Sequence, residues 1–356
     1  MLRLEDREWK PIFITDVFES MKSSSAWFDK ADIKSGIKQH PYLSQTYMSN
    51  GVLDIVADQN KPIEIGNCIT MTLKTQATFY QPFNFYTAQN FLIFRHQLLN
   101  KFNGLFLVRA MRNSIKKYSW GYGVSMSRLK KTKIMLPVTL SGEPDYAFME
   151  AYGKQLMARK ISEYEDYVRE VLDEVEYKEV PLLADKKWSD FFIEDICAIC
   201  SGMDIYDAER IAGNTPYISS TARNNGIGYF VNNKNTTLAS GCISVNRNGS
   251  VGYSFYHPYN GLFSNDCRKL TLSEGTHFAG FFLANQISAQ RGKYNYGYKM
   301  GTARLKRQKI MLPVDGNGRP DFDYMEQYAK NIYRKKIEDY LDYLGVVKAS
   351  LQAQPQ

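Results

Sequence analysis

The sequence contains few of the side chains on which catalytic and metal sites are commonly built. Four histidines among 356 residues argue against histidine-centred acid–base chemistry without excluding it. Five cysteines in a chain of this length indicate a reducing compartment and not a disulfide framework. No apolar run is long enough to cross a bilayer, and residues 1–10 lack the apolar core of a signal peptide. We therefore expect a cytoplasmic protein.

Motifs that would indicate an enzyme or a metal centre are also missing. Cys197–Cys200 has CxxC spacing, but a zinc site needs two more ligands, and no second CxxC or HxxxH is present. Arg247–Gly252 is not followed by the Gly-Lys-Ser/Thr of a phosphate-binding loop. Asn214–Tyr217 superficially resembles the Asn/Asp-Pro-Pro-Tyr/Phe loop of amino-methyltransferases, but no glycine-rich segment for S-adenosylmethionine accompanies it. We predict no catalytic residue, no metal site and no cofactor in this chain.

Positive charge and tyrosine are what the chain has in excess. The formal net charge is +8 and the isoelectric point is about 9.0, which favours a polyanionic partner. Aromatic residues make up 14% of the sequence, with 25 tyrosines. Tyrosine combines a large contact area with a hydrogen-bonding hydroxyl, so this composition is typical of recognition surfaces.

The sequence also contains one unit twice. The hexapeptide KIMLPV occurs at 133–138 and again at 309–314, an offset of 176 residues. Further matches at or near this offset are Trp9–Asp16 with Trp188–Asp195, Pro41–Thr46 with Pro216–Thr221, Cys68–Ile69 with Cys242–Ile243, Phe79–Pro82 with Phe255–Pro258, Phe102–Leu107 with Phe278–Leu283, and Arg128–Lys130 with Arg304–Lys306. Each half is therefore predicted to be a globular module followed by one long helix.

The long helix of each half is amphipathic. Each begins after a Gly-x-Pro-Asp sequence, at 142–145 and 318–321, where proline followed by aspartate favours a helix start. Apolar residues then recur at alternating steps of four and three, the spacing of a coiled coil. They are Met157, Ile161, Tyr164, Val168, Val171 and Val175 in the first helix and Tyr333, Ile337, Tyr340, Leu344, Val347 and Leu351 in the second. Since neither stripe is stable alone in water, we expect the two helices to pack together.

Within each module the pattern is mixed, which indicates an α/β fold with irregular loops. Runs rich in β-branched and aromatic residues, such as Cys68–Leu73, Tyr229–Val231 and Ile310–Val314, predict strands. Phe102–Lys117 and His277–Gln290 are apolar at helical spacing and predict helices. The boundaries that follow are 1–144 and 181–320 for the modules, with the long helices in 145–180 and 321–356.

This order of module, helix, module and helix resembles the DNA-specificity subunits of type I restriction–modification systems and of type II systems with a separate specificity subunit. The likeness rests on W-x-x-x-F-x-x-D, on P-Y-x-S-x-T followed by Asn-Gly, on the aromatic-Pro element and on R-L-K-x-x-K-I-M-L-P-V. It spans nearly the whole chain. The helix start G-x-P-D-[FY]-x-x-M-E resembles the type II members more than typical type I chains.

The resemblance implies two tandem target-recognition domains joined by an antiparallel coiled coil of the two long helices, with pseudo-two-fold symmetry. Each domain would read half of a bipartite DNA sequence in the major groove. The helical pair would set the spacing and dock methyltransferase or fused methyltransferase–endonuclease subunits, and some systems add a restriction subunit. The family's specificity subunit has no catalytic centre, so S-adenosylmethionine would bind the partner methyltransferase.

Polar loops at equivalent places in the two modules are the first candidates for DNA contact. Asparagine can read adenine, arginine can read guanine, and serine or threonine can bind a phosphate or a base. The candidate residues are Tyr42, Ser44, Gln45, Thr46 and Asn50 in the first module, Tyr217, Ser219, Ser220, Thr221, Arg223, Asn224 and Asn225 in the second, and Arg247 and Asn248 in a further loop. The alternative is that these loops are solvated turns between strands.

Basic clusters are the second group of candidates. They comprise Arg128, Lys130, Lys131 and Lys133 in the first module and Arg304, Lys306, Arg307 and Lys309 in the second. Charges at alternating positions suggest the edge of a strand that could follow a phosphate backbone. The alternative is a charged flank that keeps the strand from aggregating.

The sequence therefore predicts a non-catalytic DNA-recognition subunit of a methyltransferase or restriction complex. Two other classes stay open at this point. One is a stand-alone DNA methyltransferase or nuclease, and the other is an assembly scaffold that binds no DNA.

Overall fold

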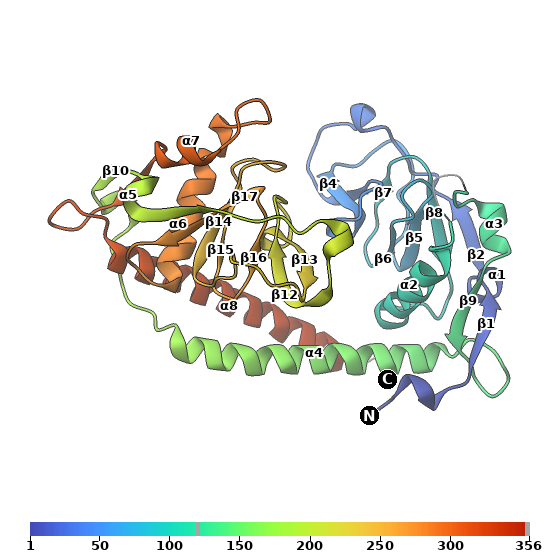
Figure 1. Ribbon diagram of the computed structural model, residues 1–356. Helices are drawn as coiled ribbons and strands as arrows, with labels where there is room; N and C mark the ends of the chain where they lie inside the picture. The colour runs from blue at the N-terminus through green and yellow to red at the C-terminus, as the bar shows by residue number, and fades with distance from the viewer. Residues whose placement is uncertain (119–121, 353–356) are drawn as a thin grey trace. The chain divides into compact units, whose positions relative to one another are not determined.

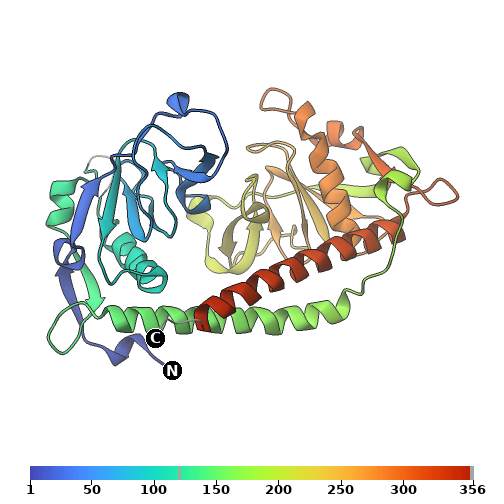
Figure 2. The same cartoon turned by 180° about the vertical axis from the view of Figure 1, so that it is seen from behind.

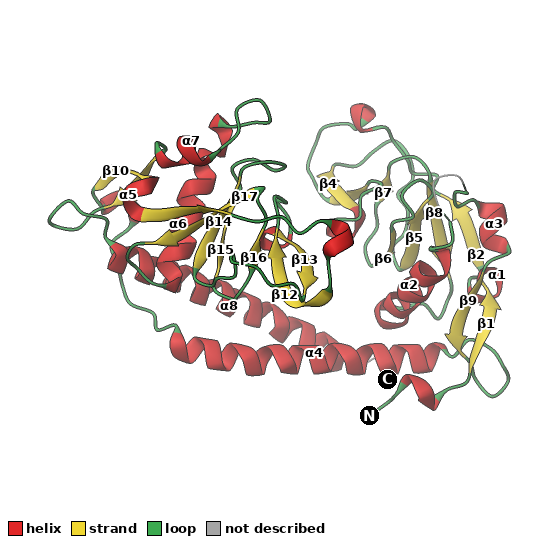
Figure 3. Cartoon of the chain, in the orientation of Figure 1, coloured by secondary structure: helices red, strands yellow, loops and turns green. Residues whose placement is uncertain are grey.

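The computed structural model describes residues 1–118 and 122–352, and of residues 350–352 it describes the backbone alone. The chain divides into two compact units, Met1–Tyr164 with Lys348–Gln356, and Glu165–Val347. Both divisions fall inside the long helices and not at their starts, so each predicted module belongs whole to one unit. Figures 1 and 3 show that each unit combines helices with strands.

The described strands of the first unit form three sheets. β1 (Trp9–Phe13) pairs antiparallel with β9 (Lys133–Pro137). A four-stranded sheet has the order β2-β8-β5-β6, with β2 at Ser20–Ser23, β8 at Phe91–Arg95, β5 at Cys68–Thr72 and β6 at Thr78–Gln81. A three-stranded sheet has the order β4-β3-β7, with β4 at Val52–Val56, β3 at His40–Leu43 and β7 at Tyr86–Thr87. The helices are α1 (Ile14–Val17), α2 (Lys101–Ile115), α3 (Met126–Lys130) and the long α4 (Tyr146–Glu174).

The second unit repeats these sheets in the same strand order. The two-stranded sheet pairs β10 (Trp188–Phe192) with β18 (Lys309–Pro313). The four-stranded sheet is β11-β17-β14-β15, at Cys197–Ser201, Cys267–Leu272, Cys242–Asn246 and Ser254–His257. The three-stranded sheet is β13-β12-β16, at Ile227–Val231, Ala212–Ile218 and Leu262–Phe263. The helices are α5 (Ile193–Ile196), α6 (His277–Ala289), α7 (Thr302–Lys306) and the long α8 (Phe322–Gln352). The predicted duplication and the predicted strands and helices are confirmed.

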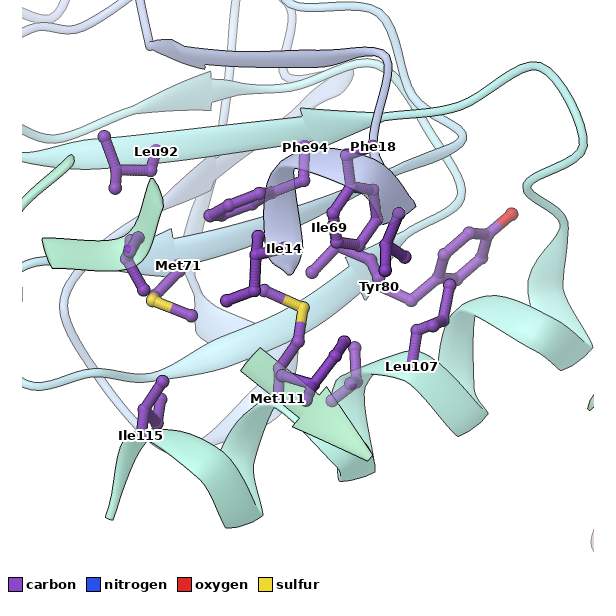
Figure 4. Packing of buried hydrophobic residues seen from close by; sticks show 14 of the residues in the cluster. Ile14, Phe18, Ile69, Met71, Tyr80, Leu92, Phe94, Leu107, Met111 and Ile115 are labelled. Carbon is purple, nitrogen blue, oxygen red and sulfur yellow. The ribbon is translucent and has the colours of Figure 1, made fainter. Parts of the chain in front are cut away.

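The core of each unit lies between its four-stranded sheet and the helix that covers it. In the first unit, Leu107 and Met111 of α2 point toward Ile69 of β5 and the neighbouring side chains of the sheet, as Figure 4 shows. The second unit buries Leu283 of α6 together with Ile243 of β14 in the same way. Removal of these apolar surfaces from water is the main stabilising contribution to each unit.

One glycine in each covering helix allows close contact with the sheet. A Cβ atom at Gly104 of α2 would lie 2.5 Å from the ring of Tyr80, and one at Gly280 of α6 would lie 2.3 Å from the ring of Tyr256. Both tyrosines are buried. The helices therefore approach the sheet to a distance that only glycine permits.

The Pro-Asp starts of the long helices are confirmed by their hydrogen bonds. Asp145 accepts one from the Phe148 backbone N–H at 2.9 Å, and Asp321 accepts one from the Tyr324 N–H at 3.0 Å. These aspartates satisfy N–H groups that have no partner within the helix. No helix of the described chain is both long and apolar enough to span a lipid bilayer.

A glutamate near the start of each long helix ties it to the covering helix. Glu326 of α8 accepts hydrogen bonds from the backbone N–H groups of Phe278 and Ala279, at 2.9 and 3.0 Å, and so caps α6. Its counterpart Glu150 of α4 accepts one from Asn100, at 2.7 Å, and the Asn100 side chain caps α2. Each long helix is thus anchored to the unit in which it begins.

The predicted apolar stripes include buried residues in both halves of the chain. Ile161, Val168, Val175, Ile337 and Leu344 are buried. Met157, Tyr164, Val171, Tyr333 and Val347 are partly buried, Tyr340 is exposed, and the side chain of Leu351 lies outside the described residues.

Within the second unit, the segment after α4 runs antiparallel to α8. Its backbone carbonyls accept hydrogen bonds from α8 in reverse order, at Val175 from Arg334 (3.1 Å), at Lys178 from Asn331 (2.6 Å) and at Pro181 from Tyr324 (2.9 Å). Figure 2 shows α8 along this unit from behind. The pairing of the two helices along their whole length, as an antiparallel coiled coil, stays a prediction.

The Gly280 contact predicts the effect of a single methyl group. Gly280→Ala forces the buried Tyr256 ring to move, so we expect a loss of about 1–3 kcal/mol in the free energy of unfolding, measured by urea denaturation. Gly345→Ala is the matched control, because Gly345 lies in α8 and, apart from its chain neighbours and helix backbone, no atom of the described residues lies within 4 Å of the added Cβ. There alanine should be neutral or stabilising by up to about 1 kcal/mol. Equal effects of both substitutions would contradict the packing argument.

Candidate nucleic-acid interface

The two polar loops predicted from the sequence have the same length and the same backbone hydrogen bonds. They follow β3 and β12 and cover residues 44–51 and 219–226. The Ser44 N–H donates to the Gly51 carbonyl at 2.9 Å, and the Ser219 N–H donates to the Gly226 carbonyl at 2.8 Å. Near the end of each loop an asparagine adopts a left-handed conformation, Asn50 with φ 54° and Asn225 with φ 53°. Asparagine tolerates this conformation better than most residues with a Cβ atom.

A buried glutamine, Gln81, fixes the loop of the first unit to the sheet. The Asn50 side-chain amide donates to the Tyr80 carbonyl at 3.0 Å. Gln81 donates to the Asn50 carbonyl and to the Thr70 hydroxyl, both at 3.1 Å, and accepts from the Asn50 amide at 3.3 Å. Since Gln81 is 4% exposed, these bonds are shielded from water and fix the loop to the sheet.

A histidine and a tyrosine take the place of that glutamine in the second unit. His257 pairs with Cys242 in the sheet as Gln81 pairs with Cys68, so the two positions are equivalent. The His257 ring contacts the Ser244 hydroxyl at 2.8 Å and the Tyr259 hydroxyl at 3.1 Å. Tyr259 in turn accepts a hydrogen bond from the Asn225 amide at 3.0 Å. Burial lowers the pKa of His257 to about 4, so the ring is neutral at pH 7.

The structure corrects the prediction that Tyr42 and Tyr217 contact DNA. Both are buried, at 2% and 3% exposure. The Tyr42 hydroxyl donates to the Phe28 carbonyl at 2.8 Å, and the Tyr217 hydroxyl accepts from the Ile205 N–H at 3.0 Å. Their side chains point into the core because they lie on the covered face of their strands. They contribute packing to the units.

The exposed parts of the two loops carry different side chains. At matching positions the first loop has Tyr47 and Met48, which are 65% and 52% exposed, and the second has Ala222 and Arg223. Gln45 of the first loop donates to the Gln89 carbonyl at 3.3 Å. The other candidates are partly buried (Ser44, Thr46, Ser219, Ser220, Thr221) or exposed (Asn50, Arg223, Asn224, Asn225). Tyr47 and Met48 were missed from the sequence because polar side chains alone were taken as the signal.

The further loop with Arg247 and Asn248 is the hairpin between β14 and β15. It lies against the polar loop of the same unit, since the Ser250 N–H donates to the Ser220 carbonyl at 3.0 Å. Arg247 forms an ion pair with Asp266 at 3.7 Å, and the Asn248 amide donates to the same carboxylate. Two polar atoms here, Arg247 Nε and Asn248 Oδ1, have no hydrogen-bond partner among the described residues.

The basic clusters do not follow one strand edge as predicted. Instead, each extends from a short helix into the next strand. Arg128 and Lys130 lie in α3, Lys131 follows it, and Lys133 begins β9, while Arg304, Lys306, Arg307 and Lys309 occupy the same places in α7 and β18. The two arginines at the helix positions are partly buried and the other six residues are exposed.

The two clusters differ in their ion pairs. In the second unit Lys309 lies 2.5 Å from Asp190 and Lys306 lies 3.8 Å from Glu194. The hydrogen bond from Lys309 lowers the pKa of Asp190. Among the described residues, Lys130 and Lys133 of the first unit have no ion pair, so they are the more available for a phosphate.

The two CxxC cysteines differ in burial. Both lie on β11, where Cys197 is buried and Cys200 is exposed. Burial raises the pKa of the Cys197 thiol to about 12. The part of the chain that the structure describes contains no cluster of three or more potential metal-binding His, Cys, Asp or Glu residues.

Known proteins with the same duplicated architecture are similar to this chain. Residues 6–165 and 185–340 match the family described as the type I restriction modification DNA specificity domain. The type II restriction enzyme specificity subunit S.BcgI of Heyndrickxia coagulans is 29% identical over 335 residues, or 93% of this chain and 96% of that protein. The crystal structure of the type I restriction–modification S subunit from M. genitalium has a TM-score of 0.51 at 15% identity, covering 98% of this chain and 96% of that one.

The chain therefore belongs to the restriction–modification DNA specificity family. It is a specificity subunit with two tandem recognition domains of mixed α/β fold.

Burial of His257 predicts a pH dependence of stability. In the unfolded chain its pKa is close to 6.5, and in the folded protein it is about 4, so between these values the unfolded state binds more protons. Stability should therefore fall as the pH drops from 6.5 to 4, by about 3 kcal/mol from this residue. His257→Gln introduces the residue that the first unit has at this place. The free energy of unfolding of this variant should not show the decline that His257 causes between pH 6.5 and 4. Parallel pH curves for the variant and the wild type would contradict the assignment.

Proposed function

We propose that this chain binds duplex DNA at a bipartite target, with one half-site for each unit, and thereby selects the sequence that a partner methyltransferase modifies. The observation that carries the proposal is the pair of polar loops, residues 44–51 and 219–226, which are fixed to the neighbouring sheet by hydrogen bonds. Their backbones have matching hydrogen bonds, yet the side chains at their tips differ. Two loops with the same backbone hydrogen bonds but different exposed side chains fit two half-sites of different sequence.

The exposed side chains suit different base edges. Arg223 has the guanidinium geometry for a bidentate contact with guanine, and Asn224 beside it has an amide suited to adenine. Tyr47 and Met48 offer the first unit apolar contact, which suits the methyl group of thymine. Lys130 and Lys133 supply charge for phosphates, which position a protein on DNA without reading its sequence.

The long helices have a separate role in this proposal. A helix of about 30 residues is roughly 45 Å long, which is sufficient to hold two recognition domains at separated half-sites. A partner methyltransferase would dock along it. Support for a protein partner comes from a groove of about 900 Å³ between α2 and α4 of the first unit, lined by Trp9, Phe106 and Leu156 among other mainly apolar side chains.

We further propose that the chain itself is not an enzyme. The methyl donor S-adenosylmethionine would bind the partner, which would flip the target base out of the stack for modification. Whether cleavage follows would depend on the partner subunits. This agrees with the chain's similarity to a protein named as a specificity subunit.

Substitution of a base-reading side chain should change specificity at one half-site. In Arg223→Ala, co-expressed with the partner methyltransferase, the methylated sites should become degenerate at one base of one half-site, because about 1–3 kcal/mol of discrimination is lost. Sequencing that detects methylated bases would read this directly.

The matched control is Lys130→Ala, which removes a phosphate contact. It should weaken binding to all sequences and reduce the slope of log K against log salt by about 1, with the methylated sequence unchanged. Identical effects of both substitutions on every sequence would refute the division between reading and positioning residues.

The purified chain should show no turnover alone. Incubation with DNA and labelled S-adenosylmethionine, or with DNA and Mg²⁺, should give neither methylation nor cleavage, whereas a salt-dependent gel shift should appear. Turnover without a partner would favour the enzyme alternative. No shift at any salt concentration would favour an assembly scaffold.

A further inference from the structure

The positive charge of the chain is concentrated in two segments, one in each unit. Ile65–Gly142 contains eleven lysines and arginines and no carboxylate, and Gly275–Val314 contains seven and none. The rest of the chain has 27 cationic residues against 37 acidic ones. The entire net charge of +8 is therefore due to these segments, which contain the covering helix, the following short helix and the loop between them.

In the second unit this loop, residues 290–301, is built around tyrosines. The sequence from Lys293 to Tyr298 is KYNYGY, and the corresponding residues 117–122 of the first unit are KYSWGY. Asn295 and Tyr298 exchange backbone hydrogen bonds of 3.2 and 3.1 Å, and the Asn295 side chain accepts a further one from the Tyr298 N–H at 2.9 Å. The turn is therefore closed and holds Tyr296 at its tip. Figure 1 shows the loop as the orange coil that projects beside α7.

A stack of three planar groups supports the turn. The rings of Tyr294 and Tyr298 are parallel within 12°, with centroids 5.6 Å apart, and the Arg304 guanidinium lies 4.0 Å from the Tyr298 centroid. Arg304 also donates to the Lys299 carbonyl at 2.8 Å, and Tyr294 donates to Gln308 at 2.7 Å. Arginine over tyrosine and stacked rings are both favourable.

The described part of the first unit contains a similar support. The Tyr118 and Tyr122 ring centroids are 5.6 Å apart with the rings inclined by 31°, and the Arg128 guanidinium lies 3.9 Å from the Tyr122 centroid. The hydroxyl of Tyr118 is 2.5 Å from that of Thr132. The support is thus present in both units, which differ at many other surface positions.

The tip of the loop is exposed. Tyr296 is 80% exposed, and the Lys299 ammonium lies 4.9 Å from its ring. Lys293 and Arg291 are exposed at the start of the loop. Burial within its own unit does not explain an aromatic side chain held here among cations. An exposed ring with cations around it is the arrangement that proteins use to stack on unstacked bases.

The loop adjoins the reading loop of the same unit through the β14–β15 hairpin. The Arg291 guanidinium lies 5.1 Å from the Tyr253 ring, and Gly252 packs against the Arg291 Cβ. The same hairpin donates from Ser250 to Ser220 in the reading loop. The three segments are therefore contiguous, so DNA seated on the reading loop lies near the tyrosine turn.

We propose that this tyrosine turn is a second DNA contact of the second unit, in which the Tyr296 ring stacks on a base that is unstacked beside the half-site while Lys293 and Lys299 neutralise flanking phosphates. The inference rests on the proposed function. Because an acidic protein surface could also match the cations, the experiment must separate DNA from a protein partner.

The test uses the complex of this chain with its methyltransferase on a labelled duplex that carries the mapped target, with binding measured by fluorescence anisotropy over a salt series. Tyr296→Ala should weaken binding roughly tenfold at every salt concentration, because stacking is not screened, while Tyr296→Phe should retain affinity. The double variant Lys293→Ala/Lys299→Ala should reduce the salt slope by about 2. Tyr206→Ala is the control, since Tyr206 is 69% exposed but lies beside the acidic Asp207, and it should bind as wild type.

The outcomes are distinguishable. If the wild-type complex shows no salt-dependent binding, the proposed function itself fails. If the wild type binds and Lys130→Ala weakens it, but the Tyr296 and lysine variants bind unchanged, this inference alone is overturned. Loss of the methyltransferase during purification of Tyr296→Ala, at unchanged DNA affinity of the remaining complex, would assign the turn to a protein contact and would also overturn it.

Discussion

An asparagine in the left-handed conformation, tied to the sheet beneath it, is the constraint on which the recognition surface depends. Asn50 and Asn225 each lie near the end of a polar loop and bond through the side-chain amide to the backbone of a neighbouring strand. Beneath them the first unit uses one buried glutamine and the second uses the pair of His257 and Tyr259. A loop fixed in this way can present different tips without a change in its backbone.

Duplication of the whole unit makes the difference between the halves informative. The sheets have the same strand order, and the covering helices meet buried tyrosine rings at equivalent glycines. Against this common frame the tips of the reading loops differ. Lys306 and Lys309 form ion pairs with acidic residues, whereas Lys130 and Lys133 form none among the described residues. We infer that the common features support the loops and that the differing ones choose the DNA sequence.

Local patterns were sufficient to predict much of the fold. The four-three spacing and the Pro-Asp caps predicted both long helices, and the repeat predicted two equal modules. The position of Tyr42 could not be predicted, because which face of a strand is covered depends on tertiary packing. His257 gave no signal in the sequence either. Its role depends on pairing with Cys242 in the sheet and on Tyr259, which links it to Asn225, 32 positions away. The basic clusters were predicted to lie on a strand because their charges alternate along the sequence. The short helix that contains the first residues of each cluster was not predicted.

The central claim is that each unit contacts its own half of one target. Hydroxyl-radical footprinting of the complex on a target duplex tests it most directly, because it reports protection at every sugar. The account predicts two protected segments separated by an accessible spacer, with the loss of one segment when the reading loop of one unit is altered. A single continuous footprint, or the loss of both segments from a change in one unit, would contradict it.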